Sequence, residues 1–261
     1  MNRILKTAQL REALQPYYSK DEIHGIMQHL TDYEDDYDKE ILLERLMNYE
    51  PVQYITGKAY FHRYSFKVTG DTLIPRPETE ELCERILLEN PNDKKHIVDF
   101  GTGSGCIPIT LLKERSNWTG LGIDISPNAI AVANSNAENL NVSNRIEFQI
   151  GDILKLNILP RADIWISNPP YISNEEKSTL SHQVHNYEPH TALFAGEDPL
   201  IFYKKMAFLF SEQHNVGEFW FEINQYLWQE TIEVFTSLNL IAKKIEDFSG
   251  NPRFIKVTKV N

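Results

Sequence analysis

The sequence predicts an α/β fold in which a mostly parallel sheet is covered by helices on both faces and follows a small helical segment. Two observations support this fold class. From about residue 75 onward, short apolar runs alternate with segments of helical spacing, the pattern of parallel strands joined by crossover helices. Before that point, Leu10, Leu14, Leu42 and Leu46 recur at helical intervals. A chain of 261 residues is long enough for one large domain or two, and we expect two.

The N-terminal part divides into two segments. Residues 1–50 are expected to form a helical domain, and residues 51–74 a β-hairpin that links it to a sheet domain at 75–261. The linker alternates apolar and polar residues around several aromatic side chains, and Thr69-Gly70-Asp71 supplies a turn.

A glycine-rich loop follows the first strand of the sheet domain. The apolar run at residues 97–100 leads into Gly101, Gly103 and Gly105, after which an apolar helix extends to about Leu112. Glycines at this place let the backbone turn sharply and approach a ligand closely. The start of the helix presents free N–H groups and the positive end of the helix dipole.

The second strand of the sheet domain ends in an acid. Asp124 follows the apolar run 121–123, close to the distance from the glycines at which an acidic side chain binds ribose hydroxyls. Ser126 and Pro127 then begin another helix, with Ser as the N-cap and Pro in the first turn. Together these features predict a half-site for a nucleoside-containing cofactor in an open sheet.

The turn Asn168-Pro169-Pro170-Tyr171, which follows the apolar run 162–167, is the most specific feature of the chain. Such a turn can hold a planar –NH2 group, because the side-chain oxygen of Asn168 can accept one hydrogen and the backbone carbonyl of Pro169 the other. The prolines restrict the backbone of the turn, and Tyr171 offers a flat ring to a planar substrate group.

The order of these motifs carries a family resemblance. The third glycine comes one place early for a dinucleotide fingerprint, where Cys106 occupies the expected position. The glycine loop, Asp124, Gly151-Asp152 and the Asn-Pro-Pro-Tyr turn resemble S-adenosylmethionine-dependent amino-methyltransferases over roughly the last two-thirds of the chain. Further segments resemble the PrmC/HemK family, whose members methylate the side-chain amide of a glutamine in peptide chain release factors; these are the segments at 50–57, 73–80, 187–189, 193–196 and 249–253.

The resemblance implies a Rossmann-like class I methyltransferase domain that uses S-adenosyl-L-methionine and acts on N5 of the glutamine in a Gly-Gly-Gln loop of class I release factors. The helical domain is then expected to recognise the release factor. The residues implied to bind the cofactor are Asp99, Gly101, Thr102, Gly103, Ser104, Gly105, Asp124, Asp152, Ile153 and Asn168. Those implied to bind the substrate amide or take part in its reaction are Asn168, Pro169, Pro170 and Tyr171.

Three side features have competing interpretations. Arg76 either lines the cofactor or product pocket or forms an ion pair with Glu78 or Glu80. His182, His185 and His190 lie close together in a polar stretch, but amide methylation needs no Lewis acid, and no metal site is expected. The tail is expected to supply strands at 218–223 and 253–258 with a helix at 228–237 between them.

Composition bounds the remaining possibilities. A net charge of −11 disfavours nucleic acid as the direct partner, because a nucleic-acid-binding face carries basic residues. Only two cysteines are present, which fits a reducing, cytoplasmic compartment. Neither a secretory signal nor a membrane span is expected, and nothing demands more than a monomer.

Three other functions remain open at the level of sequence. A nucleic-acid amino-methyltransferase acting on adenine N6 or guanine N2 would also hold a planar –NH2 group, but it should carry a basic groove. A nicotinamide-dependent oxidoreductase would leave the Asn-Pro-Pro-Tyr turn without a role. A binding protein that has lost catalysis is disfavoured by the intact Asn168 and the intact glycine loop.

Overall fold

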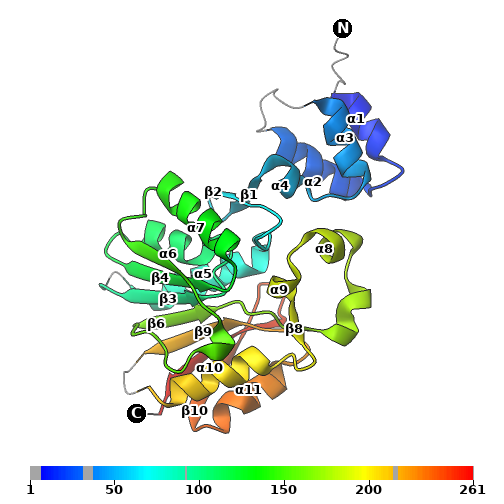
Figure 1. The fold of residues 1–261 in the computed structure, drawn as a ribbon. Coiled ribbons are helices and arrows are strands. Elements are labelled where there is room, and N and C mark those ends of the chain that lie inside the picture. Colours follow the sequence, from blue (N-terminus) through cyan, green and yellow to red (C-terminus); the bar gives the residue numbers. More distant parts are fainter. Residues whose placement is uncertain (1–6, 32–37, 92, 214–216, 261) are drawn as a thin grey trace.

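The computed structural model describes residues 7–31, 38–91, 93–213 and 217–260. A group of short helices at the N-terminal end stands apart from a larger body built on one open sheet, and a hairpin lies between them (Figure 1). The parts of the expected helical segment at 1–6 and 32–37 lie outside the described residues. Within the described residues, no helix combines the length and apolar character that crossing a bilayer requires.

The N-terminal helices have a hydrophobic core of their own. They are α1 (Thr7–Leu14), α2 (Lys20–Thr31), α3 (Lys39–Met47) and α4 (Val52–Thr56). Leu14 and Leu46 are fully buried where these helices meet, and the Tyr18 hydroxyl donates a hydrogen bond of 2.6 Å to the Leu46 carbonyl. The helices therefore pack as a unit around side chains that the helical spacing had picked out.

The prediction that the β-hairpin segment begins at residue 51 is wrong. Residues 52–56 form helix α4 rather than extended chain. The helix begins directly after Pro51, whose fixed φ suits a helix start, and it ends at Gly57, which has a left-handed φ of 67°. Its buried side chains, Val52 and Ile55, pack into the core of the N-terminal helices.

The hairpin itself is short and is bound to the sheet domain. Strands β1 (Lys58–Phe61) and β2 (Tyr64–Lys67) pair in antiparallel fashion and bury Phe61 and Phe66 in the main core. The side chain of Asn136 accepts a hydrogen bond of 2.7 Å from the Lys67 amide. It also donates to the carbonyls of Lys67 and Ser104, at 2.9 and 2.8 Å.

The sheet domain contains seven strands in the order β10-β11-β9-β6-β3-β4-β5. Five strands run parallel, and β11 is antiparallel to both of its neighbours, β9 and β10. The strands are β3 (His96–Phe100), β4 (Thr119–Asp124), β5 (Ile146–Ile150), β6 (Ile164–Ser167), β9 (Glu218–Glu222), β10 (Leu240–Glu246) and β11 (Pro252–Lys259). The predicted fold class, a mostly parallel sheet with alternating helices, is confirmed.

Two hydrophobic clusters cover the two faces of this sheet. On one face lie α5 (Pro77–Glu89), α6 (Cys106–Glu114) and α7 (Pro127–Asn139), and on the other α10 (Ile201–Ser211) and α11 (Trp228–Thr236) (Figure 1). The predicted tail elements agree with β9, α11 and β11 to within one residue at each end. Strand β10, which pairs with β11, was not predicted separately.

A long excursion separates β6 from α10. It contains β7 (Ile172–Ser173), the 3-10 helix η2 (Asn174–Thr179), α8 (His182–Tyr187), α9 (His190–Leu193) and β8 (Phe194–Gly196). Helix α8 reaches the N-terminal helices, because the Tyr187 hydroxyl donates a 2.8 Å hydrogen bond to the Asn48 carbonyl and the rings of Tyr49 and His182 lie 5.3 Å apart. The excursion thus connects the carboxyl end of β6 to the N-terminal helices.

Candidate active site

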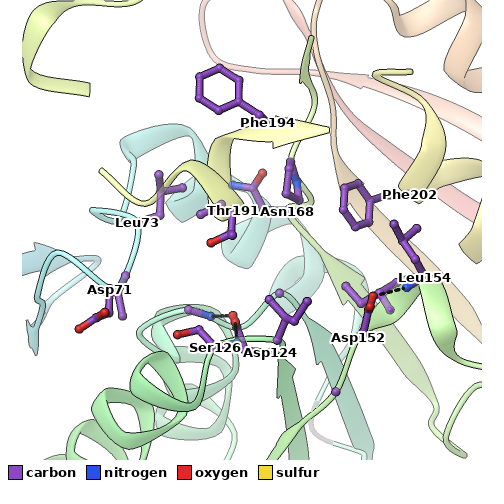
Figure 2. A pocket seen from close by; sticks show the side chains of 18 residues that line it. Asp71, Leu73, Asp124, Ser126, Asp152, Leu154, Asn168, Thr191, Phe194 and Phe202 are labelled. Carbon is purple, nitrogen blue, oxygen red and sulfur yellow. Dashed lines mark hydrogen bonds between the residues drawn. The ribbon is translucent and has the colours of Figure 1, made fainter. Parts of the chain in front are cut away.

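The carboxyl ends of the parallel strands open onto one cavity of about 280 Å³. Ligands of open α/β sheets bind at this edge, where the loops after adjacent strands diverge. Figure 2 shows side chains converging on this cavity from the loops after β4, β5 and β6 and from the excursion, and Gly101 and Gly103 of the loop after β3 also line it. The sequence-predicted residues that line it are Gly101, Gly103, Asp124, Asp152, Ile153, Asn168 and Pro170.

The glycine loop is bent by three left-handed glycines at alternate positions. Gly101, Gly103 and Gly105 have φ angles of 74°, 53° and 78°, which side-chain-bearing residues rarely adopt. A Cβ at Gly103 would meet nothing within 4 Å, so this glycine faces the open cavity. A Cβ at Gly105 would lie 2.9 Å from the Ile109 side chain, so this glycine serves close packing and does not line the cavity.

Unpaired polar groups lie buried at the base of this loop. Among the described residues, the carboxylate oxygens of Asp99 and the hydroxyls of Thr102 and Ser104 make no hydrogen bond of good geometry, although the Thr102 hydroxyl interacts with Asp99 and the Ser104 hydroxyl with Cys106. All three residues are almost inaccessible to solvent, and burial raises the pKa of Asp99 to about 7. Asp99, Thr102 and Ser104 do not line the cavity, so in this structure they lie behind the glycine loop rather than facing the open space.

Asp124 holds the glycine loop in place as well as lining the cavity. One carboxylate oxygen accepts from the Gly103 amide at 2.8 Å, and the other accepts from the Ser126 amide at 2.9 Å (Figure 2). A carboxylate has about four acceptor positions, so two remain for the hydroxyls of a ligand. The prediction of Ser126 as N-cap and Pro127 in the first turn of α7 is confirmed.

A second acid and an apolar surface form another side of the cavity. Asp152 caps the 3-10 helix η1 (Ile153–Lys155), accepts from the Leu154 amide at 3.0 Å and pairs with Lys155. Ile153 is buried beneath it, and Phe202 of α10 faces the same space. An acid beside an aliphatic and an aromatic side chain suits a flat, polar-edged ring such as a nucleobase.

The Asn168 side chain points into the cavity from the end of β6 (Figure 2). Its amide nitrogen donates to the hydroxyl of Thr79 on α5 at 3.2 Å. Pro169 and Pro170 are buried, so the backbone of the turn after Asn168 is packed against the protein. Tyr171 does not line the cavity; its ring packs against the cluster beneath α10, and burial raises its pKa.

Arg76 makes an ion pair, but with a different partner from those expected. Its guanidinium donates to both carboxylate oxygens of Glu188 at 2.6 and 2.7 Å, rather than binding Glu78 or Glu80. Glu188 is 4% exposed, so the bond lies in a largely desolvated setting. The two residues are 112 positions apart, and local charge spacing could not have identified the pair.

Several lining residues escaped sequence reasoning. Asp71, Thr72 and Leu73 reach the cavity from the chain after the hairpin, while Thr191 and Phe202 come from α9 and α10 (Figure 2). No motif marked the position of Phe202 in its helix. The Leu73 and Phe194 segments were noted only through the family resemblance.

The three histidines of the excursion contact one another and their neighbours. His182 and His185 each contact Asn186 through a ring nitrogen at 2.8 Å, and His190 contacts the His185 carbonyl at 2.9 Å. Within the parts of the chain that the structure describes, no group of three His, Cys, Asp or Glu side chains is placed to hold a metal ion.

Comparison with known proteins agrees with the geometry. Residues 91–233 match the family model described as a methyltransferase domain. The release factor glutamine methyltransferase of Flavobacterium psychrophilum is 43% identical over 84% of this chain and 79% of its own length. The enzyme of the same name from Bacteroides thetaiotaomicron is 36% identical over 99% of this chain and 100% of its own.

Solved structures show the likeness of the fold. The catalytic domain of hMettl16, in complex with an RNA hairpin of the MAT2A 3′UTR, has a TM-score of 0.59 at 15% identity and covers 75% of this chain and 76% of its own. A ribosomal protein L11 methylase from Lactobacillus delbrueckii subsp. bulgaricus has a TM-score of 0.52 at 17% identity, covering 74% and 84%. At these identities the likeness concerns the fold alone.

Fold and site together define a Rossmann-like class I methyltransferase that depends on S-adenosylmethionine. The open space at Gly103, the carboxylates of Asp124 and Asp152 and the apolar wall at Ile153 fit this cofactor, which carries ribose hydroxyls and a nucleobase. The chain belongs to the family of release factor glutamine methyltransferases.

Proposed function

We propose that this chain transfers the methyl group of S-adenosylmethionine to N5 of the glutamine in the Gly-Gly-Gln loop of class I peptide chain release factors. One observation carries the proposal beyond family membership. Asn168 and Pro170 line the same cavity as Gly101, Gly103 and Asp124. An amide held by the Asn-Pro-Pro-Tyr turn would therefore face the cofactor site directly.

The reaction is difficult because an amide nitrogen is a poor nucleophile. Its lone pair is delocalised into the carbonyl, a resonance that gives the peptide C–N bond a rotation barrier of roughly 18–20 kcal/mol. Orienting the nitrogen toward the methyl carbon is the contribution that a protein can make, and good alignment is worth roughly 7–11 kcal/mol at best. The bound cofactor supplies a methyl group on a positively charged sulfur. No general base is needed, since the proton becomes acidic once the nitrogen is methylated.

The substrate amide is proposed to be held through both of its hydrogens. The Asn168 side-chain oxygen accepts one hydrogen and the Pro169 carbonyl accepts the other, which leaves the nitrogen lone pair directed at the cofactor site. Tyr171 is proposed to support this turn from behind, since its ring packs against the core and not into the cavity. Pro170 lines the wall beside Asn168.

The cofactor is proposed to extend across the edge of the sheet. Gly101 to Gly105 are proposed to pass beneath its methionine part, and Asp99, Thr102 and Ser104 are proposed as further cofactor contacts, although here they lie behind the loop and do not line the cavity. Asp124 is proposed to bind the ribose hydroxyls with the acceptor positions left by Gly103 and Ser126. Asp152 and Ile153 are proposed to flank the adenine.

The N-terminal helices are proposed to recognise the release factor. In this division, residues 1–50 form the recognition domain, 51–74 the linker and 75–261 the methyltransferase domain. Support comes from the separate core of the helices and from their contact with α8, which belongs to the excursion that lines the cavity. We further propose a monomer that acts in the cytoplasm, in keeping with two free cysteines.

A nucleic-acid substrate has less support. Adenine N6 and guanine N2 also present a planar –NH2 group, but the net charge of −11 offers little attraction for phosphates. The structural likeness to hMettl16 rests on the shared fold, at 15% identity.

The test is methyl transfer from labelled S-adenosylmethionine to a purified class I release factor, with the loop glutamine intact or replaced by alanine. Mass spectrometry of the peptides locates the label. Label on the loop glutamine of the intact factor alone is the expected result. Absence of label from both factors, with cofactor binding retained, would overturn the proposed substrate and make nucleic acid the next to be tested.

A further inference from the structure

Asn168 is the last member of a hydrogen-bonded chain of three side chains that starts in the core. The Asn168 amide nitrogen donates to Thr79 Oγ1 at 3.2 Å, and Thr79 Oγ1 donates to Glu222 Oε2 at 2.7 Å. Thr79 is 3% exposed and Glu222 is 2% exposed. The three residues come from the loop after β6, the first turn of α5 and the end of β9.

The fold brings these elements together for reasons visible in the sheet. Strands β6 and β9 are parallel neighbours, with Ser167 opposite Phe221, so Asn168 and Glu222 leave the sheet side by side. Pro77 begins α5 immediately beside this edge, which places Thr79 between the two. A buried carboxylate is costly without a partner, and the hydroxyl of Thr79 supplies one.

The chain of bonds has a fixed polarity. An ionised carboxylate can only accept, so the single hydroxyl proton of Thr79 goes to Glu222. The Thr79 oxygen can then only accept from Asn168, which requires the –NH2 end of the Asn168 amide to face Thr79. The Asn168 oxygen is thereby turned away from Thr79. Burial raises the pKa of Glu222 to about 7, so its carboxylate is mostly ionised at pH 8.

This polarity matters because the two ends of an asparagine amide have nearly the same shape. Rotation about the terminal torsion would exchange an acceptor for a donor at the same place. A donor there would oppose the hydrogens of the substrate –NH2 group instead of binding them. The proposed function therefore needs something that selects one of the two orientations, and Asn168 cannot do so alone.

We propose that Thr79 and Glu222 are positioning residues that hold the Asn168 oxygen toward the substrate and so make the site selective for an –NH2 group. The inference rests on the proposed function, because it concerns the same site. Neither residue lines the cavity, so both act through Asn168 and do not touch the substrate.

The test compares Thr79→Val, which keeps the shape and removes the hydroxyl, with Thr79→Ser, which restores it. Thr110→Val is the matched control, because Thr110 is also fully buried and its hydroxyl has no described partner. At pH 8, kcat and KM for the release factor, the Kd for S-adenosylmethionine and the midpoint of thermal unfolding are measured for each variant.

We expect Thr79→Val to lower kcat by at least about tenfold while the cofactor Kd changes by less than about twofold, as lost alignment predicts. Thr79→Ser and Thr110→Val should retain kcat close to that of the wild type. If Thr79→Val unfolds, Thr79→Ala takes its place in the comparison with Thr79→Ser. A Thr79→Val or Thr79→Ala enzyme with wild-type kcat would overturn the inference.

A second readout distinguishes orientation from general damage. A release factor with glutamate in place of the loop glutamine presents two acceptors and no –NH2 group, and it serves as an inhibitor. The wild type should bind it more weakly than the glutamine factor, and Thr79→Val should reduce this preference, since a freely turning Asn168 can donate to a carboxylate. An unchanged preference would contradict the inference. If the wild type itself fails to methylate the factor, the proposed function fails first, and the two failures remain distinct.

Discussion

In the proposed reaction Asn168 meets two requirements with one side chain, because it accepts a hydrogen bond from the substrate amide and lies beside the cofactor. Replacing it with alanine removes the acceptor without filling the cavity. We expect Asn168→Ala to lower kcat by about 10²-fold or more, the usual cost of losing one preorganised hydrogen-bonding group, while cofactor affinity is largely kept. Steady-state kinetics and calorimetric titration measure both quantities. Asn134→Ala, at an exposed position on α7, is the control; near wild-type turnover in Asn168→Ala would refute the two-acceptor account.

Asp99 gives a prediction about pH. Burial raises its pKa from an ordinary 3.8 to about 7. The protonated form suits the folded state, so the contribution of this group to stability is fully present below pH 3.8 and is lost as the pH rises through about 7. Asp99→Asn should therefore raise the free energy of unfolding by about 2–3 kcal/mol more at pH 8 than at pH 5.

Denaturant unfolding of the cofactor-free protein at the two pH values measures this difference. Asp21→Asn, at an exposed position on α2, controls for the loss of one carboxylate. The same variant should bind S-adenosylmethionine more weakly if Asp99 accepts from its amino group. If Asp99→Asn changes the free energy of unfolding equally at pH 5 and pH 8, ionisation of buried Asp99 does not destabilise the folded protein.

Residue identities in the site were predictable where chemistry follows directly from a motif. The glycine loop, Asp124, Asp152 and Asn168 each stand at a strand end, and the parallel sheet gathers strand ends at one edge. Thr79 and Phe202 could not be found in this way, because their roles depend on tertiary contacts that no local pattern records. The same reason explains the partner of Arg76, which lies in the distant Tyr-Glu-Pro segment.

At the scale of elements, the glycines of the loop have two different roles, although they look alike in the sequence: Gly103 borders the cavity and Gly105 allows close packing. Gly105 is packed, with a Cβ position 2.9 Å from Ile109 and 3.2 Å from both Ala133 and Phe148, whereas Gly103 is open. Gly105→Ala should destabilise the protein by about 2 kcal/mol or more, since overpacking adds to the strain of a left-handed φ. Gly103→Ala should cost about 1 kcal/mol and act mainly on cofactor affinity.

Thermal unfolding and cofactor titration of the two variants make the comparison, each serving as the control for the other. Equal loss of stability in both would contradict the assignment of Gly105 to packing.

Most helices and strands of the sheet domain were predicted from the sequence because apolar runs and capping residues are local signals. Helix α4 was missed for a local reason too: Pro51 and Gly57 delimit a segment of five residues, too short to show a helical period.

At the scale of the whole molecule, the N-terminal helices and the excursion over the cavity touch through α8. The hydroxyl of Tyr187 on the Asn48 carbonyl is one of these contacts. We expect Tyr187→Phe to raise KM for the release factor about two- to fivefold, the effect of losing one hydrogen bond, with cofactor affinity unchanged. The effect is expected in KM because this contact joins the proposed recognition helices to α8, which belongs to the excursion beside the cavity.

Kinetics with an intact release factor measure the effect, and Tyr226→Phe, at a position 79% exposed, is the control. If the KM of Tyr187→Phe for the release factor equals that of the wild type, the contact between α8 and the N-terminal helices does not contribute to substrate binding. The position of the N-terminal helices against α8 could not be predicted from the sequence, because it depends on a few contacts between segments that are distant along the chain.

The side chain of Asn136 has a mechanical consequence. It binds the backbone of Lys67 in the hairpin and the carbonyl of Ser104 in the glycine loop at the same time. Strand β2 and the peptide that cradles the cofactor are therefore coupled through a single buried amide. In the proposed arrangement, a release factor bound to the N-terminal helices that displaced the hairpin would also displace the Ser104 carbonyl, unless the hydrogen bonds of Asn136 broke. The position of the glycine loop would then depend on whether the protein substrate is bound.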